Sequence, residues 1–211
     1  MFQDRLQAAR KLSKELFTRL GGELDLDNTI VLAIPKGGVP VAAIIARELT
    51  VPLNILISKK IGHPNNPNFA IGAVTELEDE IFSDKAQELG QIGIKVAKQE
   101  TLDLIYAEAE EFRPGNKPFP NVQGKTIILV DDAISTGQTV AAAIISLRKQ
   151  GAARIVLAVP VSSRDAADVL SQAVDDFVCL QKPPYFMSPS KVYTSFPTID
   201  AQEIKTTLLS F

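Results

Sequence analysis

Residues 126–139 read Thr-Ile-Ile-Leu-Val-Asp-Asp-Ala-Ile-Ser-Thr-Gly-Gln-Thr, and this stretch decides the fold. Its first five residues form strands readily and are largely apolar, which predicts a buried strand that ends at Val130. Two acids follow, and a short loop around Gly137 then leads into an apolar spacing that predicts a helix over 137–150. A strand, a loop of small residues and a helix in this order are typical of an α/β protein.

The two ends of this loop suit different chemical groups. Turn amides and a helix N-terminus carry partial positive charge and unpaired N–H groups, which suit a phosphate. We therefore predict phosphate contacts from Ser135, Thr136, Gly137, Gln138 and Thr139. The carboxylates of Asp131 and Asp132 repel phosphate, but they can accept hydrogen bonds from vicinal hydroxyls or bind Mg²⁺ through water.

A plain helix start is the alternative interpretation of the same residues, with Asp131 or Asp132 as the N-cap. Two consecutive acids and a Ser-Thr-Gly-x-Thr run favour the ligand site over this alternative. The stretch has neither the Gly-Lys-Ser/Thr of a Walker A loop nor a Gly-x-Gly-x-x-Gly turn, so it predicts neither of those nucleotide sites.

Strand-like and helix-like segments alternate through the rest of the chain. Strands are expected at 29–34, 53–57, 69–76, 81–82, 155–159 and 177–180, helices at 4–20, 39–49, 91–112, 164–173 and 200–209, and loops at 58–68 and 113–124. This alternation predicts an α/β fold with a mostly parallel central sheet flanked by helices. Ligands of such folds bind beyond the carboxyl ends of the strands, which points to the loops after Ile34, Ile57 and Val130.

Composition narrows the classes of function. The chain has 211 residues, 45% of them hydrophobic, which suits a single domain over 1–211. The net charge is −3 and the pI is about 5.3, so no nucleic-acid partner is expected. Neither a signal-peptide pattern nor an apolar run of about 20 residues is present, so no membrane contact is expected. The single cysteine, Cys179, is expected in a buried strand and fits a reducing cytoplasm.

The stretch 126–139 resembles the phosphoribosyl-diphosphate motif of the type I phosphoribosyltransferase family: an apolar strand, two acids, small residues, Thr-Gly, one residue and Thr. Four more segments extend the resemblance, in order, to a bacterial subgroup of that family. They are Ile34-Pro35-Lys36-Gly37-Gly38-Val39-Pro40-Val41-Ala42, Lys59-Lys60-Ile61-Gly62, Gly72-Ala73-Val74-Thr75-Glu76 and Val159-Pro160-Val161. The resemblance implies the type I phosphoribosyltransferase-like fold, with a small C-terminal hood at about 181–198.

The resemblance also implies a reaction. Ribose 5-phosphate would pass from phosphoribosyl diphosphate to a nitrogen base or amine, diphosphate would leave, and Mg²⁺ would be the cofactor. Residues 135–139 would bind the 5-phosphate, and Asp131 and Asp132 the ribose hydroxyls and part of the Mg²⁺ shell. The loop Lys36-Gly37-Gly38 would bind the diphosphate, with a cis peptide bond expected between Lys36 and Gly37. The catalytic candidates are Asp131, Asp132, Lys36 and Lys60.

Family members also suggest partners and a second kind of function. They commonly form homodimers, and the helix predicted within residues 1–20 is a candidate contact surface. Some members are regulatory proteins that bind phosphoribosyl diphosphate or nucleotides with little catalysis, which is the alternative function. Both functions share the same donor site.

A mobile loop covers the active site of the family in the region 58–68. Lys59 and Lys60 are candidates for reaching the diphosphate, although simple solvent exposure is an equal alternative for either. His63, the only histidine, is a candidate acid or base or a loop residue without a catalytic role. Glu76 is a candidate metal ligand.

The acceptor is less well specified than the donor. Ser135 stands where purine-salvage members often carry a third Asp near the base, which disfavours hypoxanthine or guanine and leaves adenine, a pyrimidine or an amine open. In the hood, Tyr185 and Phe186 are candidates for stacking on the acceptor ring, with Tyr193 or Phe196 packed behind them. The alternative is that these aromatic residues only attach the hood to the core.

Overall fold

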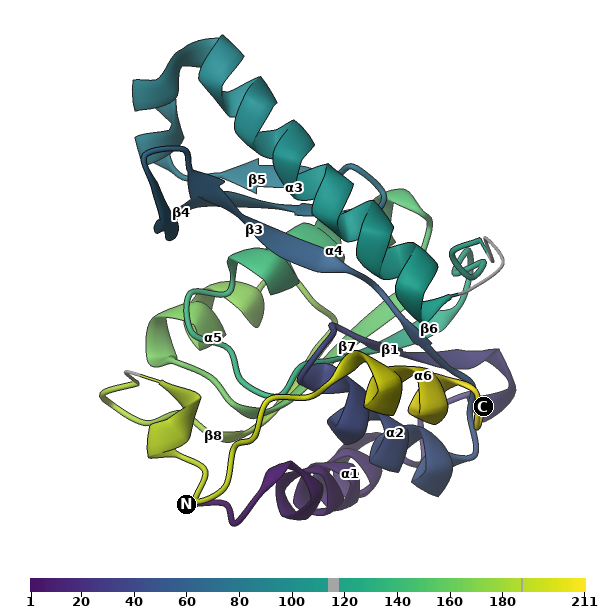
Figure 1. Cartoon of the computed structure of the whole chain (residues 1–211). Coiled ribbons are helices and arrows are strands. Elements are labelled where there is room, and N and C mark those ends of the chain that lie inside the picture. The colour runs from purple at the N-terminus through teal and green to yellow at the C-terminus, as the bar shows by residue number, and fades with distance from the viewer. Residues whose placement is uncertain (114–117, 187) are drawn as a thin grey trace.

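A five-stranded parallel sheet forms the centre of the protein, as seen in a computed structural model that describes residues 1–113, 118–186 and 188–211 (Figure 1). Its strands are β1 (Thr29–Ala33), β2 (Leu53–Ile55), β6 (Thr126–Val130), β7 (Arg154–Val161) and β8 (Asp176–Gln181). They lie in the order β2-β1-β6-β7-β8, and every neighbouring pair is parallel. The predicted mostly parallel sheet is confirmed.

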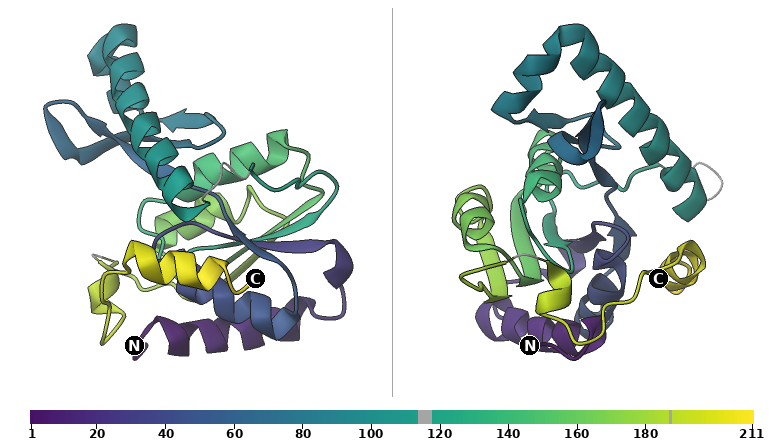
Figure 2. Two further views of the ribbon diagram at one scale, coloured as in Figure 1. Left: turned by 45° about the vertical axis from the view of Figure 1, so that its right-hand side comes forward. Right: turned by 60° about the vertical axis from the view of Figure 1, so that its left-hand side comes forward.

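Helices cover both faces of this sheet (Figures 1 and 2). They are α1 (Arg5–Leu20) and α2 (Gly38–Leu49) on one face and α4 (Gln138–Lys149) and α5 (Arg164–Leu170) on the other. Successive residues of a strand point to opposite faces, so Ile128 and Val130 pack with α1 and α2 while Ile127 and Leu129 pack with α4 and α5. Coverage on both faces explains why residues 127–130 of β6 are all apolar.

A second, antiparallel sheet stands beyond one side of the first. Its strands are β3 (Ser58–His63), β4 (Asn66–Thr75) and β5 (Glu80–Phe82), and α3 (Gly90–Phe112) packs across them (Figure 1). The predicted loop at 58–68 is therefore wrong, because most of it forms a β-hairpin. Ile61 is fully buried together with Ile71 and residues of α3, a contact between distant segments that the polar local pattern does not reveal. The predicted pairing of 81–82 with the preceding strand is confirmed.

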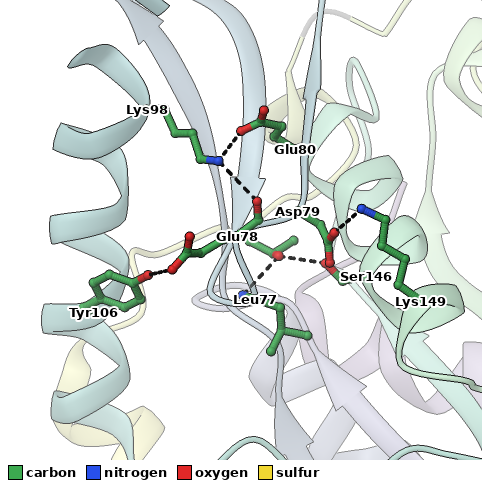
Figure 3. A network of polar contacts seen from close by, with 9 residues as sticks. Leu77, Glu78, Asp79, Glu80, Lys98, Tyr106, Ser146 and Lys149 are labelled. Carbon is green, nitrogen blue, oxygen red and sulfur yellow. Dashed lines mark hydrogen bonds and ion pairs between the residues drawn. The ribbon is translucent and has the colours of Figure 1, made fainter. Parts of the chain in front are cut away.

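The turn between β4 and β5 is attached on two sides (Figure 3). The Tyr106 hydroxyl of α3 donates a hydrogen bond to Glu78 Oε1 at 2.7 Å. On the other side, Lys149 Nζ of α4 lies 2.5 Å from Asp79 Oδ1. The small sheet is therefore joined to a helix of the main sheet as well as to α3.

The chain after β8 returns to the start of α1. This part contains η3 (Pro189–Lys191) and α6 (Ala201–Leu208), and two further short helices, η1 (Leu26–Asn28) and η2 (Asp84–Leu89), lie earlier. The Phe2 amide donates to the Val192 carbonyl at 2.8 Å, and Phe2 forms an isolated parallel bridge with Tyr193. The segment predicted as a hood, at about 181–198 and called the hood below, is thus held by residues at the N-terminal side of α1.

Several smaller predictions concern single residues or short segments. Cys179 lies on β8 as predicted, but it is only half-buried, and its Sγ donates to the Gln181 carbonyl at 3.3 Å. Residues 114–117 of the predicted 113–124 loop and Met187 of the hood lie outside the described residues. Within the described ranges, no helix combines the length and apolar character that crossing a membrane requires.

Candidate functional site

The two predicted donor-binding loops follow neighbouring strands. Ala33 and Val130 are paired at the ends of β1 and β6, and the Ile34 amide donates to the Val130 carbonyl at 2.9 Å. Carboxyl ends of parallel strands share one edge, so the loops that follow them meet there. The structure thereby brings the segments around residues 36–38 and 131–139 into one site.

The glycines of the first loop allow this approach. A Cβ atom on Gly37 would lie 1.9 Å from Asp132 Oδ2, and one on Gly38 would lie 2.7 Å from the Val130 carbonyl oxygen. Only residues without side chains can be placed so close to the acidic loop. The cis peptide bond lies between Pro35 and Lys36, one position before the predicted one, and Lys36 itself is exposed.

The predicted phosphate-binding loop, residues 135–139 and called the phosphate loop below, has the backbone of an anion site. Gly137 has a φ of 77°, and α4 begins at the next residue, so the amides of the first turn have no partners within the helix. The Ser163 hydroxyl donates to the Ser135 carbonyl at 2.6 Å, and the Ser58 hydroxyl donates to the Thr139 carbonyl at 2.9 Å. These two bonds hold the loop from both ends.

A cleft of about 480 Å³ opens beside this loop. Its polar wall contains residues 135–138 and Ser163, and its apolar wall includes Ile81, Val169 and Phe186. The cleft therefore combines the predicted phosphate-binding residues with surfaces that can contact a flat, apolar ligand.

The two acids are in different environments. Asp132 is only 8% exposed, and its Oδ2 accepts a hydrogen bond from Arg5 Nε at 2.7 Å. Asp131 is half-buried, and its Oδ1 accepts from the Asp132 amide at 2.8 Å. Burial and then the neighbouring charge of Asp132 raise the pKa of the Asp131 carboxyl well above its usual value. A bound cation would relieve this concentration of negative charge.

Magnesium fits this donor set if a substrate supplies further oxygens. Mg²⁺ is usually bound by one or two carboxylates together with substrate phosphates and water. In the described part of the chain, no group of three or more His, Cys, Asp or Glu side chains could hold a metal ion. Asp131 and Asp132 thus suit an ion shared with a phosphorylated ligand better than a site made by protein groups alone.

Arg5 is the site residue that sequence reasoning missed. Its side chain joins Asp132 to the hood, because a guanidinium nitrogen also donates to the Pro197 carbonyl at 2.6 Å. The sequence contains a signal: Arg5 precedes Ala9 by four residues and Leu12 by seven, which places it on the buried face of α1. The neighbouring apolar residue Leu6, by contrast, is 48% exposed.

The four hood aromatics divide into two pairs. Tyr193 is buried, its hydroxyl donates to the Asp132 carbonyl at 2.8 Å, and its ring centroid lies 4.9 Å from that of Phe196. Burial raises the pKa of the Tyr193 hydroxyl. Phe186 lines the cleft, whereas Tyr185 is 89% exposed on the surface. The structure therefore places Phe186, and not Tyr185, in the wall of the cleft.

The two lysines of β3 point to opposite faces of the strand. Lys59 Nζ lies 2.8 Å from Glu108 of α3. Lys60 is exposed and shares the face of Ser58, whose hydroxyl contacts the carbonyl of Thr139. Lys60 is therefore the lysine on the side of the phosphate loop.

Two other candidates are occupied by local contacts. Glu76 forms a buried ion pair with Arg113, and its Oε1 also accepts from the Ile57 amide at 2.8 Å. His63 Nδ1 accepts from the Asn65 amide at 3.1 Å within the β3–β4 hairpin. Both side chains therefore have structural partners in or beside the small sheet.

Residues 2–191 match the family model described as the phosphoribosyl transferase domain. The chain belongs to this family. It is 33% identical, over 97% of its length, to "Putative phosphoribosyl transferase Rv0571c" of Mycobacterium tuberculosis. The matched region is 45% of that protein, so the chain spans about half the length of this relative.

Other comparisons agree with the family and the fold. The crystal structure of TT1426 from Thermus thermophilus matches the whole of this chain with 98% of its own chain, at a TM-score of 0.81 and 30% sequence identity. The bifunctional protein PyrR of Trichormus variabilis is 25% identical over 85% of this chain and 83% of its own. The type I phosphoribosyltransferase fold inferred from residues 126–139 is thus confirmed for the phosphoribosyl transferase domain described here.

Proposed function

We propose that the protein transfers ribose 5-phosphate from phosphoribosyl diphosphate to a nitrogen base or amine and releases diphosphate. The observation that carries the proposal is the meeting of two loops: the glycines after β1 lie directly against the acidic pair after β6, and the phosphate loop follows on the same segment. A phosphate, a sugar diol and a diphosphate are the three parts of the donor, and each has a matching group here.

The phosphate loop anchors the donor. In this proposal, residues 135–139 bind the 5-phosphate with the amides at the start of α4 and with their hydroxyls. The bonds from Ser58 and Ser163 hold the loop in position before the ligand arrives. A preorganised site of this kind loses little entropy on binding.

The acidic pair orients the sugar in the same proposal. Asp131 and Asp132 accept hydrogen bonds from the ribose hydroxyls, and Mg²⁺, when bound, lowers the cost of charge on the leaving diphosphate. Lys36 and the amides of Gly37 and Gly38 contact the diphosphate, and Lys60 approaches it from β3. These groups stabilise negative charge that grows as the bond to the ribose C1 breaks.

Family likeness leaves the acceptor open, and the structure offers one candidate wall for it. Phe186, Val169 and Ile81 form the apolar side of the cleft, which suits a flat ring. Ser135 carries no carboxylate, which disfavours hypoxanthine or guanine. We also propose a cytoplasmic homodimer, for which the exposed Leu6 and Phe17 of α1 are candidate contacts.

A second candidate is a regulatory protein that binds phosphoribosyl diphosphate or a nucleotide with little catalysis. The similarity to the bifunctional protein PyrR motivates this alternative. The two candidates share the donor site and differ in turnover.

One experiment separates them. The protein is incubated with phosphoribosyl diphosphate, Mg²⁺ and a panel of bases and amines, and diphosphate release is measured beside donor binding by calorimetry. We expect acceptor-dependent release that is lost in the Asp131→Asn/Asp132→Asn variant. Tight binding without release for any acceptor would favour the regulatory protein. Absence of donor binding would contradict both candidates.

A further inference from the structure

Arg5 is buried at the point where α1, the hood and the acidic loop meet. Its side chain is 9% exposed, its Nε donates to Asp132 Oδ2 at 2.7 Å, and a terminal nitrogen donates to the Pro197 carbonyl at 2.6 Å. The guanidinium carbon also lies 3.6 Å from the centroid of the Phe196 ring. Two edges of the guanidinium are thus held by hydrogen bonds, and one of its faces packs on the Phe196 ring.

Stability alone is a weak explanation for this arrangement. Removing a guanidinium and a carboxylate from water is costly, and well-packed apolar residues often stabilise a fold as much as a buried ion pair does. What an arginine adds is direction, since its planar donors fix the orientation of the carboxylate they bind. The carboxylate fixed here belongs to the loop that would bind the donor sugar.

Asp132 is also constrained from two other directions. The Tyr193 hydroxyl holds its carbonyl at 2.8 Å, and Gly37 lies so close that an added Cβ would fall 1.9 Å from Oδ2. Arg5 is the constraint that acts on the carboxylate through a charge-assisted hydrogen bond. Tyr193, Phe196 and Pro197 all belong to the hood, so the same contacts connect the hood to Asp132.

We infer that Arg5 is a positioning residue, which orients Asp132 toward the ribose hydroxyls and links this carboxylate to the hood. The inference rests on the proposed function, because it assigns Asp132 to the sugar of the donor. Arg5 touches neither the phosphate loop nor, in this proposal, the ligand. Its loss should therefore affect sugar recognition and leave phosphate recognition intact.

Two probes test this difference. Calorimetry with Mg²⁺ present compares ribose 5-phosphate, which needs both ends of the loop, with inorganic phosphate, which needs only residues 135–139. In Arg5→Met, affinity for ribose 5-phosphate should fall at least about tenfold, the factor that corresponds to about 1.4 kcal/mol. Affinity for phosphate should stay within about twofold of the wild type, which is below about 0.5 kcal/mol.

Matched variants complete the test. Arg10→Met removes an exposed arginine from the same helix and should change neither affinity. Arg5→Lys keeps the charge and should recover part of the lost ribose 5-phosphate affinity. Asp132→Asn combined with Arg5→Met should bind ribose 5-phosphate no more weakly than Asp132→Asn alone, because Arg5 acts through Asp132.

The outcomes distinguish this inference from the proposed function. If wild-type protein binds ribose 5-phosphate and Arg5→Met binds it equally well, or loses both ligands equally, the role of Arg5 is overturned and the proposed function stands. If the wild type binds no ribose 5-phosphate, the proposed function fails and this inference fails with it. Should Arg5→Met not fold, Arg5→Lys decides in the same way: a selective loss of sugar affinity supports the inference, and an unchanged ratio of the two affinities overturns it.

Discussion

Replacing Gly37 by alanine should destabilise the protein through one contact. Gly37 has φ −66° and ψ −30°, which any residue adopts easily, so the backbone conformation does not require glycine. The available space does require glycine, because the new Cβ would lie 1.9 Å from Asp132 Oδ2 and 2.4 Å from its Cγ. Because carbon and oxygen atoms without a bond stay more than about 3 Å apart, the carboxylate or the loop must move by about 1 Å.

The cost follows from what holds the carboxylate. Asp132 is 8% exposed, and the oxygen that the Cβ meets is the one bound to Arg5 at 2.7 Å. Removing one partner of a buried ion pair costs roughly 3–5 kcal/mol, and a displaced partner keeps part of the interaction, so we expect a loss of about 2–3 kcal/mol. For a chain of this size, about 1 kcal/mol shifts the melting temperature by about 2–4 °C, which gives a decrease of about 4–12 °C.

Thermal denaturation followed by circular dichroism measures this decrease. Gly22→Ala is the matched control, because a Cβ at Gly22 meets nothing within 4 Å. If Gly37→Ala melts together with Gly22→Ala and the wild type, the close packing of the 36–38 loop against Asp132 is refuted. Ribose 5-phosphate affinity should fall in parallel with stability, since the displaced carboxylate belongs to the proposed sugar site.

Three further changes test the other parts of the site. Because the pKa of Asp131 is raised in the folded state, the folded state binds this proton more tightly than the unfolded chain, and stability is lost as pH rises from about 3.8 toward the folded pKa. Asp131→Asn should therefore raise the melting temperature of the ligand-free protein at pH 7 and weaken ribose 5-phosphate binding. A lowered melting temperature would contradict the pKa shift. In calorimetry, Lys60→Ala should weaken phosphoribosyl diphosphate binding at least about tenfold and Lys59→Ala less than about twofold, a difference of about 1 kcal/mol. A larger loss of affinity in Lys59→Ala than in Lys60→Ala would exchange the roles of the two lysines. Gly137→Ala should lower the free energy of unfolding by about 1–2 kcal/mol in chemical denaturation and weaken inorganic phosphate binding, because φ is 77° there and the Cβ would meet Leu170 Cδ1 at 3.1 Å. Unchanged phosphate affinity would contradict the assignment of phosphate to this loop.

Sequence reasoning succeeded where the determining contacts are local. Residues 127–130 are all apolar and buried because the sheet is covered on both faces, and this pattern is visible in the sequence. The loop after it carries its candidate phosphate-binding groups in consecutive residues, so this proposal could be made from five positions. The structure adds that Gly137 has a positive φ directly before α4.

The failures concern contacts between distant segments. The β3–β4 hairpin is stabilised by Ile61 and Ile71 against α3, and neither its pairing nor this packing can be recognised in a local run that contains two lysines, a glycine and a histidine. Arg5 was missed for a similar reason, since its two hydrogen-bonding partners are 127 and 192 residues away in the sequence. The different directions of Lys59 and Lys60 became visible only once β3 was known to be a strand.

The contacts of Arg5 also determine when the site can form in a growing polypeptide. Translation at about 5–20 residues per second separates the synthesis of Arg5 from that of Pro197 by roughly 10–40 s. The strands of the main sheet all precede Phe196 and Pro197 in the sequence and are synthesised before them, and until then Arg5 lacks the Pro197 carbonyl and the Phe196 ring. The Asp132 carboxylate, which the proposed function assigns to the sugar, therefore reaches its final environment only after the hood has been synthesised, which makes the proposed donor site a late product of the folding of a nascent chain.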